Sequence, residues 1–443
     1  MTGEGLPPIA IRTFAHYYAQ LAAGHTGLLP EAELEPATGI PDADALDPAL
    51  AAAGRRELSR TVMLKLNGGL GTGMGLERAK SLLVVKDGLT FLDIIAGQAA
   101  AAGVPLILMN SFSTRGDSLA RLAAHRLPDR GLPADFLQHK VPKILVEGLR
   151  PAAWPREPAL AWCPPGHGDL YTALQTSGAL KRLLAAGYRY AFVSNADNLG
   201  ATIDPVILGH VATGGAPLVM EVADRTPADR KGGHLARDRD GRLVLRELAQ
   251  CPPADEAFFQ DLRRHRYFNT NTLWLDLKAV DDVLRRQDGI LGLPMIRNRK
   301  TLDPRDPGSP AVYQLETAMG AAITLFPGAA ALRVPRARFA PIKHTSDLLV
   351  VRSDCYLLEP DYRVVPNPAR TLPPPVVELD PAHYRFVDDL ERRFPAGAPS
   401  LIGCRRLVVR GDIRFGHGVV LKGEVELTAA PGTVREIPDN SYL

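Results

Sequence analysis

Short runs of apolar residues alternate along the middle of this chain with longer stretches whose apolar positions recur at helical spacing. The strand-like runs are 62–66, 105–109, 136–138, 190–193 and 217–222. The helix-like stretches are 91–102, 117–124, 170–186 and 205–211. Short buried strands that alternate with helices predict right-handed βαβ units, and therefore an α/β fold with a mostly parallel sheet.

The pattern changes at both ends of the chain. Before residue 60, prolines and glycines separate two helix-like segments, 11–21 and 49–58. After a proline-rich linker at 360–375 and a helix-like segment at 384–394, glycines separate short apolar runs at near-regular spacing over 400–427. This spacing predicts a small parallel β-helix. The expected parts are an N-terminal helical segment (1–60), an α/β core (61–360) and a linker with the β-helix domain (361–443).

The first strand-like run leads into a glycine-rich segment, Asn-Gly-Gly-Leu-Gly-Thr-Gly-Met-Gly at 67–75. Glycine allows positive φ and a close approach of the backbone to a ligand, and successive N–H groups in such a loop can hold phosphate oxygens. Lys80 follows and adds a mobile positive charge. The segment matches neither a Walker A loop nor a Rossmann fingerprint. It is either a phosphate-binding loop or a turn that only packs, and its own residues do not decide between the two.

Residues that directly follow the other strands are also candidates, because ligands of open parallel sheets bind at the carboxyl ends of the strands. Asp197 follows a buried run and has Asn195 beside it. Mg²⁺ takes one or two carboxylates together with substrate phosphate oxygens, so Asp197 suits a magnesium site. Alternatively, it caps the helix near Asp204 or bonds its own turn. His167 lies between two glycines and is either a ligand contact or a turn residue.

Two charged residues later in the chain have strong alternative explanations. Glu316 is expected to begin a helix of small residues that runs to 323, where the helix dipole already favours an acid. Lys343 precedes the apolar run 348–351 and could reach a phosphate from the side opposite the glycine loop, but most lysines in such positions only face solvent.

Composition excludes several classes of function. Hydrophobic residues make up 46% of the chain and charged residues 23%, as in ordinary globular proteins. A net charge of +3 over 443 residues is too small for a nucleic-acid footprint. The isolated cysteines argue against a disulfide framework or zinc site. Without a membrane-spanning run or a signal peptide, we expect a soluble, cytoplasmic protein that binds neither nucleic acid nor membranes.

Short motifs occur in order from about residue 60 to near the C-terminus. They are KLNGGLGT at 65–72, DGLTFLD at 87–93, PGHGD at 165–169, DNLG at 197–200, KGG at 231–233, FNTN at 268–271, QLET at 314–317, TSDLL at 345–349, GD at 411–412, FG at 415–416 and VVLKG at 419–423. With these motifs the chain resembles the UTP–glucose-1-phosphate uridylyltransferases, or UDP-glucose pyrophosphorylases, of the type best known from eukaryotes.

The resemblance implies a mixed, mostly parallel α/β nucleotidyltransferase core, Rossmann-like and GT-A-like, with a C-terminal left-handed parallel β-helix. It also implies Mg²⁺-dependent formation of UDP-glucose and pyrophosphate from UTP and glucose 1-phosphate. By position, the nucleotide would be bound by Leu66, Asn67, Gly68, Gly69, Gly71, Thr72, Lys80, Gln138, Gly168 and Asp197. The sugar phosphate would be bound by His167, Asn195, Asn271, Glu316 and Lys343.

Within these sets the resemblance assigns distinct roles. Lys80 and Lys343 would be catalytic and would meet the phosphates. Asp197 would hold Mg²⁺, Gln138 would read the uracil with help from the backbone of Gly168, and Glu316 would bind sugar hydroxyls.

The sequence also departs from the family pattern. Gly73 replaces the usual serine, and 170–174 differs from the usual residues near the sugar. The chain stops soon after 439, in a region that relatives extend and use to form oligomers, so a homo-oligomer through the C-terminal domain stays open. One alternative function is a uridylyltransferase for another sugar 1-phosphate, such as that of galactose or N-acetylglucosamine. Another is a non-catalytic nucleotide-sugar sensor.

Overall fold

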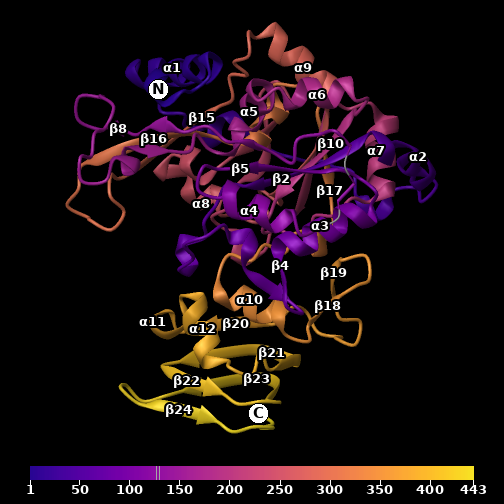
Figure 1. Cartoon of the computed structure of the whole chain (residues 1–443), viewed down its shortest axis with the longest axis vertical. Coiled ribbons are helices and arrows are strands. Elements are labelled where there is room, and N and C mark those ends of the chain that lie inside the picture. Colours follow the sequence, from indigo (N-terminus) through magenta and orange to yellow (C-terminus); the bar gives the residue numbers. More distant parts are fainter. Residues whose placement is uncertain (126, 129) are drawn as a thin grey trace.

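The structure is a computed structural model that describes residues 1–125, 127–128 and 130–443. Two parts follow one another along the long axis of the molecule: a larger α/β part and, below it in Figure 1, a smaller C-terminal part of stacked strands. Among the described residues, no helix combines the length and the apolar character needed to cross a membrane.

A 10-stranded sheet forms the centre of the larger part. One half of the sheet consists, in spatial order, of β10 (Tyr190–Asn195), β2 (Thr61–Asn67), β5 (Leu106–Asn110) and β6 (Asp135–Leu137). These strands are parallel to one another, so their carboxyl ends meet at one edge of the sheet. The apolar runs that predicted β2, β5 and β10 are almost completely buried, whereas in β6 only Phe136 is buried.

The other half of the sheet runs differently. Its strands are β1 (Leu34–Pro36), β11 (Leu218–Asp224), β12 (His234–Asp238), β13 (Leu243–Arg246), β14 (Tyr267–Asp276) and β17 (Ala330–Arg333). β14 is antiparallel to β10 and β11, and β12 is antiparallel to β1 and β13. The sheet is mixed as expected, but the expectation of mostly parallel strands is wrong for this half. The connection from β12 to β13 is too short for a crossover, so these two strands can pair only antiparallel. The apolar pattern of a strand predicts that it is buried, but not whether it runs parallel or antiparallel to its neighbour.

Alternate residues of β2 pack against helices on opposite faces of the sheet. Met63 belongs to an apolar cluster with residues of α3 (Phe91–Ala101) and α7 (Pro205–Gly214). Leu64 belongs to the cluster on the other face, with residues of α5 (Leu170–Thr176), α6 (Ala179–Ala185) and α9 (Leu277–Arg286). Figure 1 shows α3 and α4 (Arg115–Leu122) below the sheet and α5, α6 and α9 above it. Because successive side chains of a strand point to opposite faces, β2 contributes to the apolar clusters on both sides of the sheet.

The helix expected over 170–186 is interrupted. α5 (Leu170–Thr176) ends and α6 (Ala179–Ala185) begins on either side of Gly178, whose φ of 72° is left-handed. Glycine adopts this conformation without steric cost, so the chain changes direction there. The helix-like segment expected over 384–394 contains α12 (Val387–Arg393), and the short helix α11 (Pro381–Tyr384) precedes it.

Glu316 does not begin a helix, so this expectation is wrong. It lies in β16 (Ala311–Thr317), which pairs antiparallel with β15 (Met295–Thr301) over its whole length. The run of small residues forms a 3₁₀ helix, Met319–Thr324, only after the strand ends. The backbone of Glu316 forms its hydrogen bonds with β15. The residues next to Glu316 in the sequence do not reveal this partner strand. β15, β16 and β8 (Ile144–Leu145) form a small sheet that projects from the core (Figure 1).

The N-terminal segment is tied to the core in several places. α1 (Pro8–Ala22) packs Tyr17 and Leu21 against the base of the projecting sheet. α2 (Leu50–Glu57) crosses α7 where both helices carry glycine. A Cβ atom on Gly209 would lie 2.0 Å from the Leu50 carbonyl oxygen, so the two backbones touch.

We expect Gly209→Ala to lower the free energy of unfolding by about 1–3 kcal/mol, because the methyl group has to push α2 away. Gly214→Ala in the same helix is the matched control, since a Cβ there meets nothing within 4 Å. Urea denaturation of the two variants measures the difference. Equal stabilities would contradict the close crossing.

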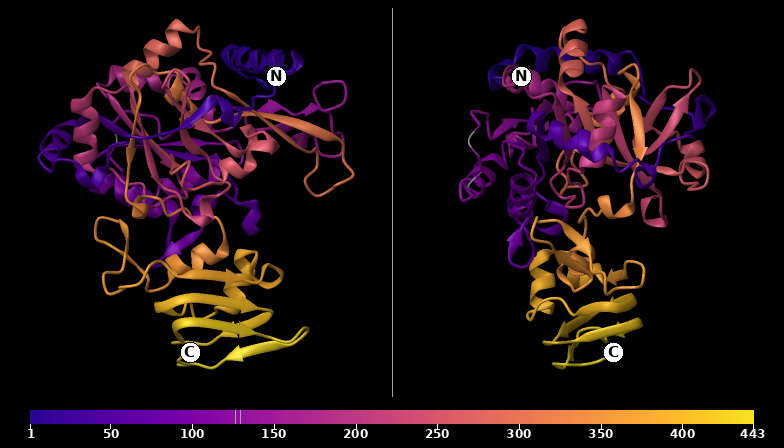
Figure 2. Two further views of the ribbon diagram at one scale, coloured as in Figure 1. Left: turned by 180° about the vertical axis from the view of Figure 1, so that it is seen from behind. Right: turned by 90° about the vertical axis from the view of Figure 1, so that its right-hand side faces the viewer.

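The C-terminal part contains parallel strands. They are β20 (Val376–Leu379), β21 (Ser400–Arg410), β22 (Asp412–Phe415), β23 (Val420–Thr428) and β24 (Val434–Ile437). β20, β21 and β23 pair in one sheet, and β22 pairs with β24 in another. Leu407 and Leu421 are buried between them. Figure 2 shows these strands stacked below the larger part, beside the hairpin of β18 (Tyr356–Leu358) and β19 (Val364–Pro366).

Candidate active site

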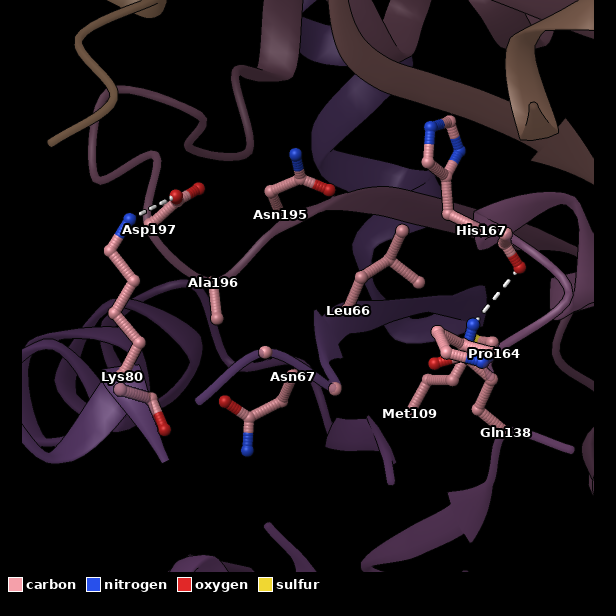
Figure 3. Close-up of a pocket in the computed structure, with 14 residues that line it drawn as sticks. Leu66, Asn67, Lys80, Met109, Gln138, Pro164, His167, Asn195, Ala196 and Asp197 are labelled. Carbon is pink, nitrogen blue, oxygen red and sulfur yellow. Dashed lines mark hydrogen bonds and ion pairs between the residues drawn. The ribbon is translucent and has the colours of Figure 1, made fainter. Parts of the chain in front are cut away.

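A cleft of about 320 Å³ opens where the parallel strands end. Residues that follow β2, β6 and β10 line it, together with the loop before α5 (Figure 3). The lining residues are Leu66, Asn67, Gly68, Gly69, Lys80, Ser81, Met109, Gln138, Pro164, Gly166, His167, Asn195, Ala196 and Asp197. This is the edge at which ligands of open α/β sheets bind.

One end of the cleft is charged. Lys80 Nζ lies 2.7 Å from Asp197 Oδ2, and the two side chains are 16% and 25% exposed. The backbone N–H of Lys80 donates to the Gly69 carbonyl oxygen, which keeps the lysine against the glycine loop. Asp197 does not cap the next helix, because the Asp204 carboxylate accepts the N–H of Val206 at the start of α7. The charged end therefore presents one cation and one carboxylate that a phosphate and a metal ion could separate.

The opposite end of the cleft is neutral. Gln138 Nε2 donates to the Gly166 carbonyl oxygen at 2.9 Å, and Met109 and Pro164 add apolar surface (Figure 3). A Cβ on Gly68 would lie 2.7 Å from Gln138 Oε1, so the glycine lets the amide lie directly against the loop. An amide beside apolar side chains suits a nucleotide base better than a phosphate.

Side-chain hydrogen bonds hold the glycine loop in place. Asn67 donates to Asn110 Oδ1 at 2.7 Å and to Ser118 Oγ at 2.8 Å, and it is buried. Ser111 Oγ donates to the Gly68 carbonyl oxygen. The Asn67 side chain therefore supports the loop, and its backbone is the part available to the cleft. Gly71 has a left-handed φ of 72°, which allows the loop to turn back.

His167 is fixed as a single neutral tautomer. Its Nδ1 accepts the backbone N–H of Met319 at 3.0 Å. Loss of solvent around the ring lowers the pKa of His167 to about 4, so the imidazole is neutral near pH 7. Since Nδ1 is an acceptor, Nε2 carries the proton and can donate to an anionic ligand without adding charge.

A buried ionic network supports the turn that carries Asn195 and Asp197. Lys65 Nζ donates to Ser194 Oγ at 2.7 Å and to the Ala201 carbonyl oxygen at 3.0 Å. Burial lowers the pKa of Lys65 to about 7. Arg338 donates to the Thr202 carbonyl oxygen and to both carboxylate oxygens of Glu221. The sequence placed Lys65 only in a motif and gave no sign of its partners, which come from distant segments.

Further polar groups gather at the neighbouring strand β14. β14 pairs antiparallel with β10 as far as Val193 and Leu273, so Asn271 lies two residues beyond the last paired position, near the carboxyl end of β10. Asn271 has a positive φ of 54°, and its N–H donates to Asn269 Oδ1. These bonds place Asn271 at the same edge of the sheet as the cleft.

Glu247 was missed by the sequence motifs. Its carboxylate lies against Gly233, where a Cβ would approach within 2.5 Å. Burial raises the pKa of Glu247, while a hydrogen bond from Asn269 and the charge of Lys343 oppose that rise. The glycine pair 232–233 before β12 was the one signal in the sequence that could have pointed to Glu247, because glycine leaves space for a neighbouring side chain.

The cleft lining gathers only some of the candidate residues. Those brought together are Leu66, Asn67, Gly68, Gly69, Lys80, Gln138, His167, Asn195 and Asp197. Those outside the lining are Gly71, Thr72, Gly168, Asn271, Glu316 and Lys343.

Each of the outlying residues has a definite place. Thr72 begins a short 3₁₀ turn within the glycine loop. Gly168 lies behind the cleft, where a Cβ would strike Thr317 Oγ1 at 2.3 Å. Glu316 lies next to Gly166, because Thr317 N–H donates to the Pro165 carbonyl oxygen. Lys343 is exposed and lines a separate cavity of about 590 Å³ with residues of the C-terminal part.

The donor groups fit magnesium better than a metal held only by protein. Among the residues that the structure describes, no group of three or more His, Cys, Asp and Glu side chains could hold a metal ion. Mg²⁺ bound to a nucleotide needs only one or two carboxylates besides phosphate oxygens and water. Asp197 at the charged end supplies such a carboxylate.

Comparisons with known proteins agree in one family. The family model of UTP–glucose-1-phosphate uridylyltransferase matches residues 12–422. The enzyme of that name from Solanum tuberosum is 41% identical over 397 residues, which are 88% of this chain and 81% of that protein. The one from Saccharomyces cerevisiae is 40% identical, over 87% of this chain and 77% of that protein. A Leishmania major UDP-glucose pyrophosphorylase mutant, solved in complex with UDP-glucose, is 43% identical with a TM-score of 0.91, covering 100% of this chain and 96% of that one. The chain belongs to the UTP–glucose-1-phosphate uridylyltransferase family.

Proposed function

We propose that this protein converts UTP and glucose 1-phosphate into UDP-glucose and pyrophosphate. The observation that carries the proposal is the polarity of the cleft, with Lys80 and Asp197 at one end and the Gln138 amide at the other. A nucleoside triphosphate has the same polarity, since its phosphates need cations and its base needs hydrogen-bonding groups. The family to which the chain belongs supports the same reaction.

In this reaction a phosphate oxygen of glucose 1-phosphate attacks the α-phosphorus of UTP, and pyrophosphate leaves in line. A sugar phosphate is already anionic near neutral pH, so no general base is needed. The protein has to bring two polyanions together in the right orientation and offset their charge. Lysines, backbone N–H groups and a magnesium ion are suited to this task.

The nucleotide half of the site follows from the cleft. Backbone N–H groups of the glycine loop would hold phosphate oxygens, and Lys80 would exchange Asp197 for a phosphate. Asp197 would then hold Mg²⁺, which supplies positive charge at the phosphates. Gln138 would read the uracil at the neutral end, with the backbone of Gly168 nearby.

The sugar half uses groups from both sides of β10. His167 Nε2 and Asn195 would donate to the sugar phosphate. Asn271 and Glu316 would face the sugar, and we add Glu247, whose partly buried carboxylate can accept bonds from sugar hydroxyls. Lys343 would approach the phosphates from the C-terminal side.

The C-terminal part fits a left-handed parallel β-helix that follows the catalytic core. Val434 and Tyr442 are 48% and 67% exposed near its end, and apolar exposure of this kind suits contact with a second copy of the chain. The chain would then consist of an N-terminal segment (1–60), a catalytic core (61–360) and a linker with the C-terminal β-helix domain (361–443).

The test of the proposed reaction is a panel of sugar 1-phosphates with UTP and Mg²⁺, read by pyrophosphate release. We expect kcat/KM for glucose 1-phosphate to exceed that for the galactose and N-acetylglucosamine compounds by about tenfold or more, because misplaced hydroxyls leave buried polar groups unpaired. A preference for another sugar would reassign the substrate. No turnover with any sugar would favour a nucleotide-sugar sensor.

A further inference from the structure

Gln138 reaches the neutral end of the cleft in one fixed orientation. Its Nε2 donates to the Gly166 carbonyl oxygen at 2.9 Å. A carbonyl oxygen only accepts, so an amide turned by 180° would place two oxygens against each other. The Gly166 carbonyl therefore determines that nitrogen faces it and that Oε1 lies on the side of Gly68, in the cleft.

This orientation matters for the choice between pyrimidines. Uracil presents an N3–H donor and an O4 acceptor, whereas cytosine presents an N3 acceptor and an N4 donor. An amide oxygen that faces the base accepts from uracil N3–H and repels cytosine N3. The opposite orientation of the same side chain would reverse this preference. Selectivity then depends on what holds the Gly166 carbonyl against Gln138.

His139 and Asp169 form a buried pair that joins the segment of Gln138 to the loop of Gly166. The backbone N–H of His139 donates to Asp169 Oδ2 at 2.7 Å, and His139 Nδ1 lies 2.9 Å from Asp169 Oδ1. The two side chains are only 8% and 6% exposed. Burial raises the pKa of Asp169, and its bonds to His139 oppose that rise. Such a carboxylate is stable inside the protein only with its partner in place.

The pair lies directly behind the base end of the cleft. His139 follows Gln138, and Asp169 ends the loop that contains Gly166 and His167. On the far side of the ring, His139 Nε2 lies 3.1 Å from Thr176 Oγ1 of α5. A shift of either segment would therefore change the contact between Gln138 and Gly166.

We propose that His139 and Asp169 are positioning residues that make the cleft select uracil over cytosine, by keeping the Gln138 amide in one orientation. This inference rests on the proposed function, in which Gln138 faces the base. It assigns to the pair a role in nucleotide specificity in addition to its role in packing.

The experiment compares UTP with CTP in the full-length enzyme, with glucose 1-phosphate and Mg²⁺. The wild type is expected to prefer UTP. Asp169→Ala should lower the ratio of the two kcat/KM values about tenfold or more, since the amide is then free to turn. Asp169→Asn should keep the ratio within about threefold, because its oxygen can accept the backbone N–H of His139 and its amide nitrogen can donate to His139 Nδ1.

Asp93→Ala is the matched control. Asp93 is as deeply buried, and Arg121, His125 and Thr90 bond its carboxylate, but it does not line the cleft. Its removal should lower stability and leave the nucleotide ratio unchanged. If Asp169→Ala does not fold, His139→Asn replaces it, since it keeps the backbone bond to the carboxylate and loses the ring.

An equal loss of kcat/KM for UTP and for CTP in Asp169→Ala would show that the pair has only a structural role, and would overturn the proposal. Equal kcat/KM values for UTP and CTP in the wild type would also overturn it. Failure of the proposed function is recognised separately, as absent turnover with both nucleotides. In that case the difference between the thermal shifts caused by UTP and by CTP tests selectivity without catalysis. Loss of that difference in Asp169→Ala supports the proposal, and its persistence refutes it.

Discussion

Lys80→Ala is expected to lower kcat by about 10²–10³-fold, the usual effect of losing one preorganised charge contact to the transition state. Lys80 Nζ lies at the charged end of the cleft, 2.7 Å from Asp197. Because both substrates are polyanions, removal of this cation raises the cost of bringing them together. It also leaves the partly buried Asp197 without its partner.

Steady-state pyrophosphate release, at saturating UTP and glucose 1-phosphate, measures this effect. Lys278→Ala is a suitable control, since Lys278 is an exposed lysine of α9 that pairs with Asp282. The control should keep the wild-type rate. A loss of less than about fivefold in Lys80→Ala would remove the lysine from the catalytic groups.

Lys343→Ala is also expected to lower kcat by about 10²–10³-fold, although Lys343 is exposed and lies outside the cleft. Its charge already acts on the partly buried Glu247, which places it on the side of the site that we propose for the sugar. To meet a phosphate, the segment before α10 (Thr345–Arg352) has to move towards the cleft when substrates bind. The loss should therefore fall on kcat more than on the affinity for UTP.

Single-turnover kinetics and UTP titration separate these two quantities. Lys422→Ala, an exposed lysine of β23, provides the comparison. Full activity of Lys343→Ala would show that the assignment of this lysine is wrong.

The strand edge of the site was predictable because its residues are local. The glycine loop directly follows the apolar run 62–66, and Asp197 closely follows the apolar run 190–193. Because both strands are buried, the sequence shows each of them as a short apolar run. Parallel strands then bring their ends together by geometry alone. In this way the sequence placed Gln138, Asn195 and Asp197 near one another before any contact was known.

The pairings across the chain were not predictable in the same way. Lys80 and Asp197 are 117 positions apart, and the contact depends on how the loops fold. Glu316 was assigned to a helix because nearby residues are small, whereas its partner strand β15 determined the outcome. Glu247 and Lys65 acquire their environment from distant segments, so no local pattern reported it.

The N-terminal strand β1 has an effect that reaches beyond the site. It pairs with residues 236–238 of β12 at the border of the central sheet. Its last residue, Pro36, has no N–H, so the strand offers a poor template for a further chain. A segment without catalytic groups thus covers the backbone of β12 at this border of the sheet, and we expect a chain cut before β2 to expose that backbone and to associate more readily.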